Sequence, residues 1–230
     1  MTTFPASSAS DALLERVSAN LDEIRRRIAS TGTDPASVRL VAVTKTFGAD
    51  EVRAAYALGL RHFGENYVEE LCEKHSAFEG DDASWHFLGA LQTNKIARAL
   101  RCADVLSGVS RTRELDKIAS LEPGATIDVQ VDFTGEAQRN GATPEDVEGL
   151  VTRARELNLK VRGLMVVAPP GEERTRAAFA STVALADRLG VAERSMGMSE
   201  DLEIALEQGT TELRLGRALF GPRQSVSALA

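Results

Sequence analysis

The sequence predicts an α/β fold, a single (β/α)8 barrel of the TIM type with one extra helix at its N-terminus. Eight short apolar segments alternate with helix-like segments along the chain, and this alternation is typical of parallel strands joined by crossover helices. The eight units fit into fewer than two hundred residues without a linker, which suits one barrel. A doubly wound open sheet is the alternative, but no G-x-G-x-x-G motif follows any of the strands.

The extra helix comes first. Residues 1–10 are rich in Ser and Ala and are expected to form a flexible tail, with residues 11–230 as one domain. After the tail, apolar residues recur at spacings of three and four, as on one face of a helix: Leu14, Val17, Leu21, Ile24 and Ile28. Gly32 and Pro35 end this helix.

The repeating units follow. Short apolar segments predict strands at 39–43, 61–64, 85–89, 103–109, 126–132, 161–167, 194–198 and 212–216. Helix-like segments lie at 50–58, 66–78, 93–101, 111–120, 144–158, 173–189 and 199–208. Several of these helices end at a glycine, as expected for helix C-caps.

Composition excludes several classes of protein. The 230 residues are 43% hydrophobic and carry a formal net charge of −7 with both signs interspersed, which argues against a nucleic-acid or anionic-membrane binder. The chain start has no basic and apolar signal pattern, and no apolar run approaches a membrane span. We therefore expect a cytoplasmic protein. It is expected to be a monomer, since no long apolar helix face demands a partner.

Polar side chains gather where the predicted strands end, and in a parallel barrel these ends meet at one mouth. The residues expected there are Lys45, Glu65, Asn66, His86, Gln92, Asn94, Met165, Ser199, Arg214, Gly216 and Arg217. Ser199 is expected to be the N-cap of the helix at 199–208. Gly216 is expected to let the backbone approach a ligand. The loops after strands seven and eight are the usual phosphate site of such barrels.

Lys45 closes the apolar run "VAVTKT". On its own it reads either as a strand-end lysine reaching solvent or as an amine held for its chemistry. A phosphorylated carbonyl compound joined to Lys45 as a Schiff base fits both the amine and the adjacent phosphate loops, because burial favours the neutral amine that imine formation needs.

Six segments carry a resemblance to a known family: "AVTKT", "FGENYVEE", "WHFLGALQTNK", "GLMVV", "SMGMSEDLEIAL" and "ELRLGRALFG". In this order, from about Arg39 to Phe220, they resemble the pyridoxal-phosphate homeostasis protein family (YggS/PROSC). That family has a single barrel like the N-terminal domain of alanine racemase and carries pyridoxal 5′-phosphate (PLP) on a lysine.

The resemblance implies a role for each matching residue. Lys45 would be the Schiff-base lysine, and Ser199 with the backbone of Gly216 and Arg217 would hold the phosphate. Arg214 would face the pyridine nitrogen. Asn66 and His86 would be further pocket residues, although His86 reads equally well as a satisfied core histidine. Met165, near the end of the sixth strand, is expected beside them.

Arg214 also bears on turnover. Most PLP enzymes pair the pyridine nitrogen with a carboxylate, which keeps the ring a strong electron sink, whereas a guanidinium cannot accept a proton. The resemblance therefore implies a non-enzyme that binds PLP covalently through Lys45 and buffers or delivers it, with PLP-dependent apo-enzymes as recipients. Alanine racemase uses a tyrosine from a second domain, and this chain has only Tyr56 and Tyr67, on predicted helices.

Two segments depart from the family pattern. Arg217 stands where the family has a threonine, which removes one hydroxyl contact to phosphate but offers a guanidinium. After strand five, Arg139-Asn140-Gly141 replaces the usual Lys-Ser-Gly turn. If this turn helps to transfer or sense PLP, we expect a difference in PLP release rather than in binding.

The remaining candidates favour ordinary structural roles. His62 and His75 are expected at the surface, and the histidines have no metal-ligand spacing. Cys72 and Cys102 show no C-x-x-C motif and are expected to pack in helices rather than form a disulfide. Glu65 reads as a solvated or ion-paired loop carboxylate rather than a general base.

Two other functions stay open beside the PLP holder. One is a PLP-dependent amino-acid racemase or lyase, and the other is a Schiff-base aldolase acting on sugar phosphates. Isotope exchange at the α-carbon of an amino acid would support the first, and a colourless protein that borohydride traps only with added substrate would support the second.

Overall fold

The computed structural model describes residues 10–136 and 138–222, and within them eight parallel strands form the closed barrel expected from the sequence. The strands are β1 (Arg39–Val43), β2 (His62–Glu65), β3 (Ser84–Phe87), β4 (Val105–Val109), β5 (Thr126–Val131), β6 (Lys160–Val166), β7 (Glu193–Ser195) and β8 (Glu212–Leu215). Nearly all of the expected tail, residues 1–9, lies outside the described residues.

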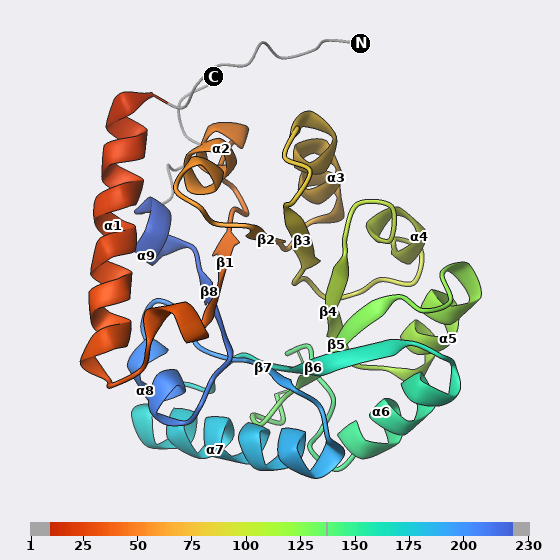
Figure 1. Ribbon diagram of the computed structural model, residues 1–230. Coiled ribbons are helices and arrows are strands. Elements are labelled where there is room, and N and C mark those ends of the chain that lie inside the picture. Colours follow the sequence, from red (N-terminus) through yellow and green to blue (C-terminus); the bar gives the residue numbers. More distant parts are fainter. Residues whose placement is uncertain (1–9, 137, 223–230) are drawn as a thin grey trace.

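Helices surround the sheet on all sides (Figure 1). They are α1 (Asp11–Ser30), η1 (Pro35–Ser37), α2 (Ala49–Ala57), α3 (Val68–Ala77), α4 (Ile96–Ala99), α5 (Thr112–Leu121), α6 (Val147–Glu156), α7 (Glu172–Leu189), α8 (Leu202–Glu207) and α9 (Arg217–Phe220). From α2 to α8 the helices follow one another clockwise in Figure 1, and α1 lies outside α8 and α9. With right-handed crossovers, this order means that the view looks onto the end where the strands begin.

Pairing of the first strand with the last closes the barrel. β1 pairs with β8, with Val41 beside Arg214 and Ala42 beside Leu215. Lys45 follows β1 and Gly216 follows β8. The predicted lysine and phosphate segments therefore lie next to each other at the same end of the barrel, as the sequence suggested.

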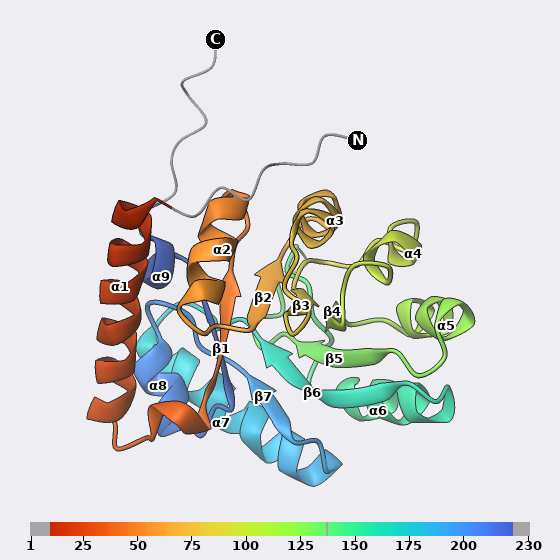
Figure 2. The same cartoon turned by 45° about the horizontal axis from the view of Figure 1, so that its top comes forward.

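The extra helix α1 packs beside α2, α8 and α9 (Figures 1 and 2). Its buried residues are Leu13, Val17, Leu21, Ile24 and Ile28, so the expected stripe is right except that Leu13 replaces the partly buried Leu14 at its start. The side-chain amide of Asn20 donates to the carbonyl of Leu219 at 2.9 Å. This contact fixes α9 against α1.

The expectation for the cysteines was wrong. Cys72 of α3 and Cys102, which follows α4, form a disulfide with a Cα–Cα distance of 5.2 Å. The residues are 30 positions apart, and only the packing of consecutive crossover helices brings them together. Spacing along the chain therefore gave no sign of the bond.

Candidate functional site

A cavity of about 900 Å³ lies at the carboxyl ends of the strands. It is lined by seven of the eight residues predicted for the cofactor: Lys45, Asn66, Met165, Ser199, Arg214, Gly216 and Arg217. These residues come from five different strand ends or the loops that follow them. The barrel closure, rather than proximity in sequence, assembles them.

Lys45 reaches this cavity from the turn after β1, beside the start of α9. A Cβ added to Gly216 would meet the carbonyl oxygen of Val43 at 3.1 Å. Gly216 therefore allows the β8–α9 turn to lie directly against β1. The sequence predicted close approach of this backbone to a ligand, and the structure adds close approach to the strand that carries Lys45.

The turn after β7 differs from the prediction. Asp201, not Ser199, is the N-cap of α8, and its Oδ1 accepts a hydrogen bond from the backbone N–H of Met198 at 2.5 Å. Gly197, with φ of 98°, starts this tight turn. The hydroxyl of Ser199 instead accepts from the backbone N–H of Ala218 at 3.1 Å. Ser199 thus joins the two turns that form one wall of the cavity.

Arg214 is buried at the cavity, with a relative exposure of 5%. One terminal nitrogen donates to the backbone oxygen of Ser195 at 2.6 Å and to its hydroxyl at 2.8 Å. The other donates to the carbonyl of Val166 at 2.7 Å. Burial lowers the pKa of Arg214, with Glu212 acting against it. A guanidinium still keeps its proton at ordinary pH, so the cavity presents a permanent donor here.

Two further arginines line the cavity. Arg217 pairs with Glu200 at 2.5 Å. Arg139 donates to the carbonyl of Ala168 at 3.2 Å and pairs with Glu136 at 3.4 Å. Both departures from the family pattern therefore reach the same cavity.

Sequence reasoning missed part of the wall. The segment from Val167 to Glu172 lines the cavity, as do Leu88 and Met198. The Pro169-Pro170 pair after β6 marks a loop, and this signal could have indicated the first segment. Leu88 takes the inward position after β3, where His86 was expected.

His86 does not line the cavity, so of its two interpretations the buried core histidine agrees with the structure. His86 is fully buried with 0% exposure, and its Nε2 lies 3.1 Å from Nδ1 of His62. Side chains of a strand alternate between faces, so His86 points inward but one layer below the cavity that Leu88 lines. Burial lowers the pKa of His86 to about 3, so it is neutral. Contrary to expectation, His62 is half-buried, whereas His75 is exposed as predicted.

Glu65 also lies outside the cavity. It is fully buried, and its Oε1 accepts from Lys74 at 2.6 Å. The ion-paired interpretation of this carboxylate is confirmed. Gln92 and Asn94 are exposed and do not line the cavity either.

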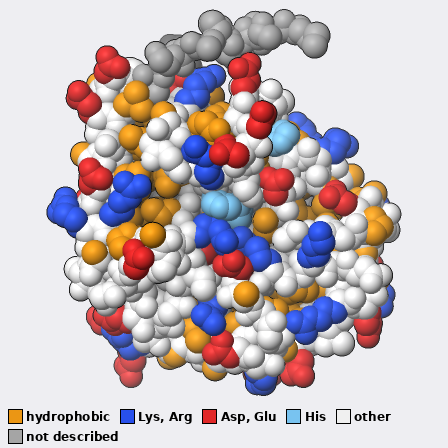
Figure 3. Space-filling view, viewed as in Figure 1, with side chains coloured by type: hydrophobic (Ala, Val, Ile, Leu, Met, Phe, Trp, Pro, Cys, Tyr) orange, Lys and Arg blue, Asp and Glu red, His pale blue; other side chains and the backbone are white. Residues whose placement is uncertain are grey.

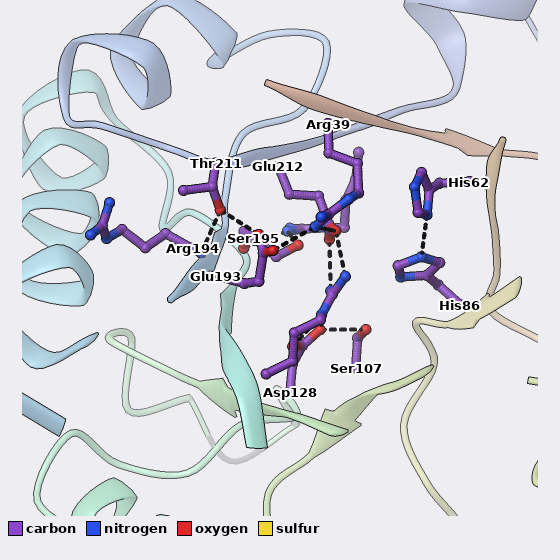
Figure 4. Close-up of polar contacts among 12 residues, drawn as sticks. Arg39, His62, His86, Ser107, Asp128, Glu193, Arg194, Ser195, Thr211 and Glu212 are labelled. Atoms are coloured by element: carbon purple, nitrogen blue, oxygen red, sulfur yellow. Dashed lines mark hydrogen bonds and ion pairs between the residues drawn. The ribbon is translucent and has the colours of Figure 1, made fainter. Parts of the chain in front are cut away.

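A polar cluster fills the opposite end of the barrel, where the strands begin. Arg162 donates to Asp128 at 2.5 and 2.9 Å and to Glu212 at 2.8 Å. Arg39 contacts Glu212 at 3.3 Å, and Figure 4 shows these two residues with Asp128. A histidine and basic side chains surface at the centre of this face (Figure 3). Polar groups at this end of a TIM barrel usually serve stability rather than chemistry.

The described part of the chain has neither a candidate metal-binding cluster nor a candidate membrane-spanning helix. Residues 10–136 and 138–222 contain no group of three or more His, Cys, Asp or Glu side chains arranged to hold a metal ion. Within the same residues, no helix has the length and apolar character needed to cross a membrane.

The chain matches known proteins over most of its length. Residues 13–224 match the family model described as the alanine racemase N-terminal domain. A "Pyridoxal phosphate homeostasis protein" of Pseudomonas aeruginosa is 38% identical over 220 residues, which covers 92% of this chain and 96% of the relative. One of Deinococcus radiodurans is 39% identical over 209 residues, covering 89% and 99%.

A solved structure agrees with these relatives. PipY of Synechococcus elongatus with PLP bound has a TM-score of 0.79 and 33% identity, covering 89% of this chain and 100% of PipY.

Proposed function

This chain belongs to the pyridoxal phosphate homeostasis protein family, and on that premise we propose that it binds PLP at the barrel mouth through Lys45. The observation that carries the proposal is the shared cavity. An amine, a phosphate-type loop and a buried permanent donor all line it, on Lys45, Ser199 with Gly216, and Arg214.

The residues fit this cofactor chemically. The hydroxyl of Ser199 and the backbone of Gly216 and Arg217 supply groups suited to a phosphate, with the Arg217 guanidinium beside them. Asn66 and Met165 complete the wall. Lys45 lies beside the turn after β8, and it supplies the amine that condenses with an aldehyde to form the Schiff base.

Arg214 supports a holding role rather than turnover. Bound PLP would supply an electron sink for amino-acid chemistry, and its strength depends on protonation of the pyridine nitrogen. Arg214 would donate a hydrogen bond to that nitrogen. Because a guanidinium has no acceptor, it cannot accept a hydrogen bond from the protonated nitrogen and so does not stabilise that form. Neither of the chain's two tyrosines lines the cavity. We propose that the protein buffers or delivers PLP, with PLP-dependent apo-enzymes as recipients.

Absorbance spectroscopy of the Lys45→Ala variant tests the proposal. The wild-type protein loaded with PLP should show the imine absorbance band, and Lys45→Ala should lose it. Lys95→Ala is the matched control, because Lys95 pairs with Glu69 at 3.0 Å and does not line the cavity. An unchanged band in Lys45→Ala would contradict the proposal.

The second candidate is a PLP-dependent racemase or lyase, which the match to the alanine racemase N-terminal domain favours. Deuterium exchange at the α-carbon of a panel of amino acids separates it from a PLP holder. Exchange well above that of free PLP would identify an enzyme.

A further inference from the structure

Charged side chains hold the backbone next to Lys45 from outside the main cavity. The Nζ of Lys74 donates to the carbonyl oxygen of Thr44 at 2.7 Å, to Glu65 at 2.6 Å and to Glu70 at 3.1 Å. None of these three charged residues lines the main cavity. Glu70 and Lys74 line a second cavity of about 690 Å³, formed by α1, α2, α3 and the loop after β1. The function proposed above leaves all three unused.

Glu70 holds the residue on the other side of Lys45. Its Oε2 accepts a hydrogen bond from the backbone N–H of Thr46 at 2.8 Å. Thr46 has φ of 65°, a left-handed conformation that is rare for a β-branched residue. Such strain persists only where surrounding contacts hold it, and it clusters at functional sites. The strained residue directly follows the lysine that reaches the cavity.

Lys74 and Glu65 are buried, and Lys74 and Thr44 donate to the same oxygen of Glu65. The Lys74 side chain is 8% exposed and that of Glu65 is fully buried. The hydroxyl of Thr44 donates to the same Glu65 oxygen at 2.5 Å, and the other oxygen of Glu65 has no hydrogen-bond partner among the described residues. A buried ion pair adds little net stability because desolvating its charges offsets their attraction. Stability alone is therefore a weak reason for this arrangement.

We propose that Lys74 and Glu70 are positioning residues for Lys45: together they fix the backbone on both sides of it, so that its amine enters the cavity in one direction. This inference rests on the proposed function of Lys45. In the reaction concerned, the Lys45 nitrogen forms a C=N bond to the aldehyde carbon. The aldehyde oxygen leaves as water with two protons from the amine, and nothing is oxidised or reduced.

Lys74→Met and Glu70→Ala separate positioning from general binding. For each variant, stopped-flow absorbance gives the rate of condensation with PLP. A titration gives the affinity for pyridoxine 5′-phosphate, which carries an alcohol in place of the aldehyde. Because displacement of a reacting group by about 1 Å can cost roughly 100-fold in rate, we expect condensation to slow by about tenfold or more. The affinity for pyridoxine 5′-phosphate should stay close to that of the wild type.

The control is Lys95→Met, which removes a partly exposed lysine outside both cavities and should change neither quantity. If Lys74→Met does not fold, Glu70→Ala decides, because the Glu70 side chain is 29% exposed and tolerates removal better. Amide hydrogen exchange of the ligand-free variants should be faster at Thr46 than in the wild type.

Two results would overturn the inference: condensation at the wild-type rate in both folded variants, or an equal loss of affinity for the aldehyde and the alcohol. A wild-type protein that forms no bond at Lys45 would refute the proposed function itself, which keeps the two failures distinct.

Discussion

Arg214 combines two roles that can be separated by substitution. Its guanidinium donates to the carbonyls of Ser195 and Val166, and in the proposed function it also donates to the ring of PLP. Arg214→Met keeps much of the stem and removes all donors. Since buried acceptors left without a partner cost about 1–3 kcal/mol, we expect urea unfolding to show a loss of that size.

The same variant should still form the bond at Lys45 but hold PLP less tightly, as measured by equilibrium titration. Arg176→Met is the control, because Arg176 is a partly exposed arginine that pairs with Glu172 and Glu207 and does not line the cavity. Unchanged PLP affinity in folded Arg214→Met would show that Arg214 does not contact the cofactor.

Helix α1 supports the cavity without lining it. Arg27 of α1 donates to both carboxylate oxygens of Glu203 in α8, at 2.6 and 2.8 Å, and to the carbonyl of Ser199 at 3.2 Å. The bond to Glu203 raises the pKa of Arg27, so the pair stays charged. The extra helix therefore fixes the turn that carries the Ser199 hydroxyl.

Arg27→Ala should weaken PLP binding several-fold while costing only about 0.5–1 kcal/mol of stability, because the pair is partly exposed. Arg26→Ala on the same helix is the matched control, since the Arg26 side chain is 73% exposed and its partner among the described residues is Glu23 of the same helix. Titration with PLP and thermal unfolding check both variants. Equal PLP affinity in the two variants would contradict this role of α1.

The strands and most helices were predictable from the sequence because each repeats a simple apolar pattern. β1 begins and ends as predicted, and other boundaries differ by a few residues. The cap of α8 was not predictable, because Ser199 and Asp201 both have side chains suited to an N-cap. Whether His86 or Leu88 reaches the cavity depends on which layer of inward-pointing side chains lies at the height of the cavity. That layer is set by barrel stagger rather than by the local pattern.

The site was predictable where strand ends carry polar residues, and not where charged groups act from outside the barrel. Lys74 sits mid-helix in α3, and nothing in its local sequence distinguishes it from a solvated lysine. Only the packing of α3 on β2 and β3 brings it to Glu65 and to Thr44, which follows β1.

The whole barrel has a cavity at one end and the polar cluster of Arg39, Asp128, Arg162 and Glu212 at the other. His86 lies near that cluster, and its low pKa makes the stability of the fold depend on pH. Burial is the main cause of its low pKa, about 3, while Arg162, His62 and Arg39 act in the same direction and Glu212 opposes them. The folded protein therefore keeps His86 neutral, whereas the unfolded chain binds a proton below about pH 6.5. Above about pH 6.5 the neutral His86 causes no loss of stability. As the pH falls from there towards 3, the unfolded chain gains a proton that the folded protein does not, so the free energy of unfolding decreases.

Urea unfolding between pH 6.5 and 4.5 should show this loss, with a slope of up to about 1.4 kcal/mol per pH unit from one group. His86→Gln should flatten the dependence by that amount, and His75→Gln, at an exposed position, should leave it unchanged. Identical pH dependence in the wild type and His86→Gln would contradict the neutral, buried state of His86.

The attachment of PLP to Lys45 is tested most directly by borohydride reduction of the PLP-loaded wild-type protein, followed by peptide mapping with mass spectrometry. We predict one modified lysine, in the peptide that contains Lys45, and no modification in Lys45→Ala. Modification at any other lysine in place of Lys45, or none at all, would contradict the account.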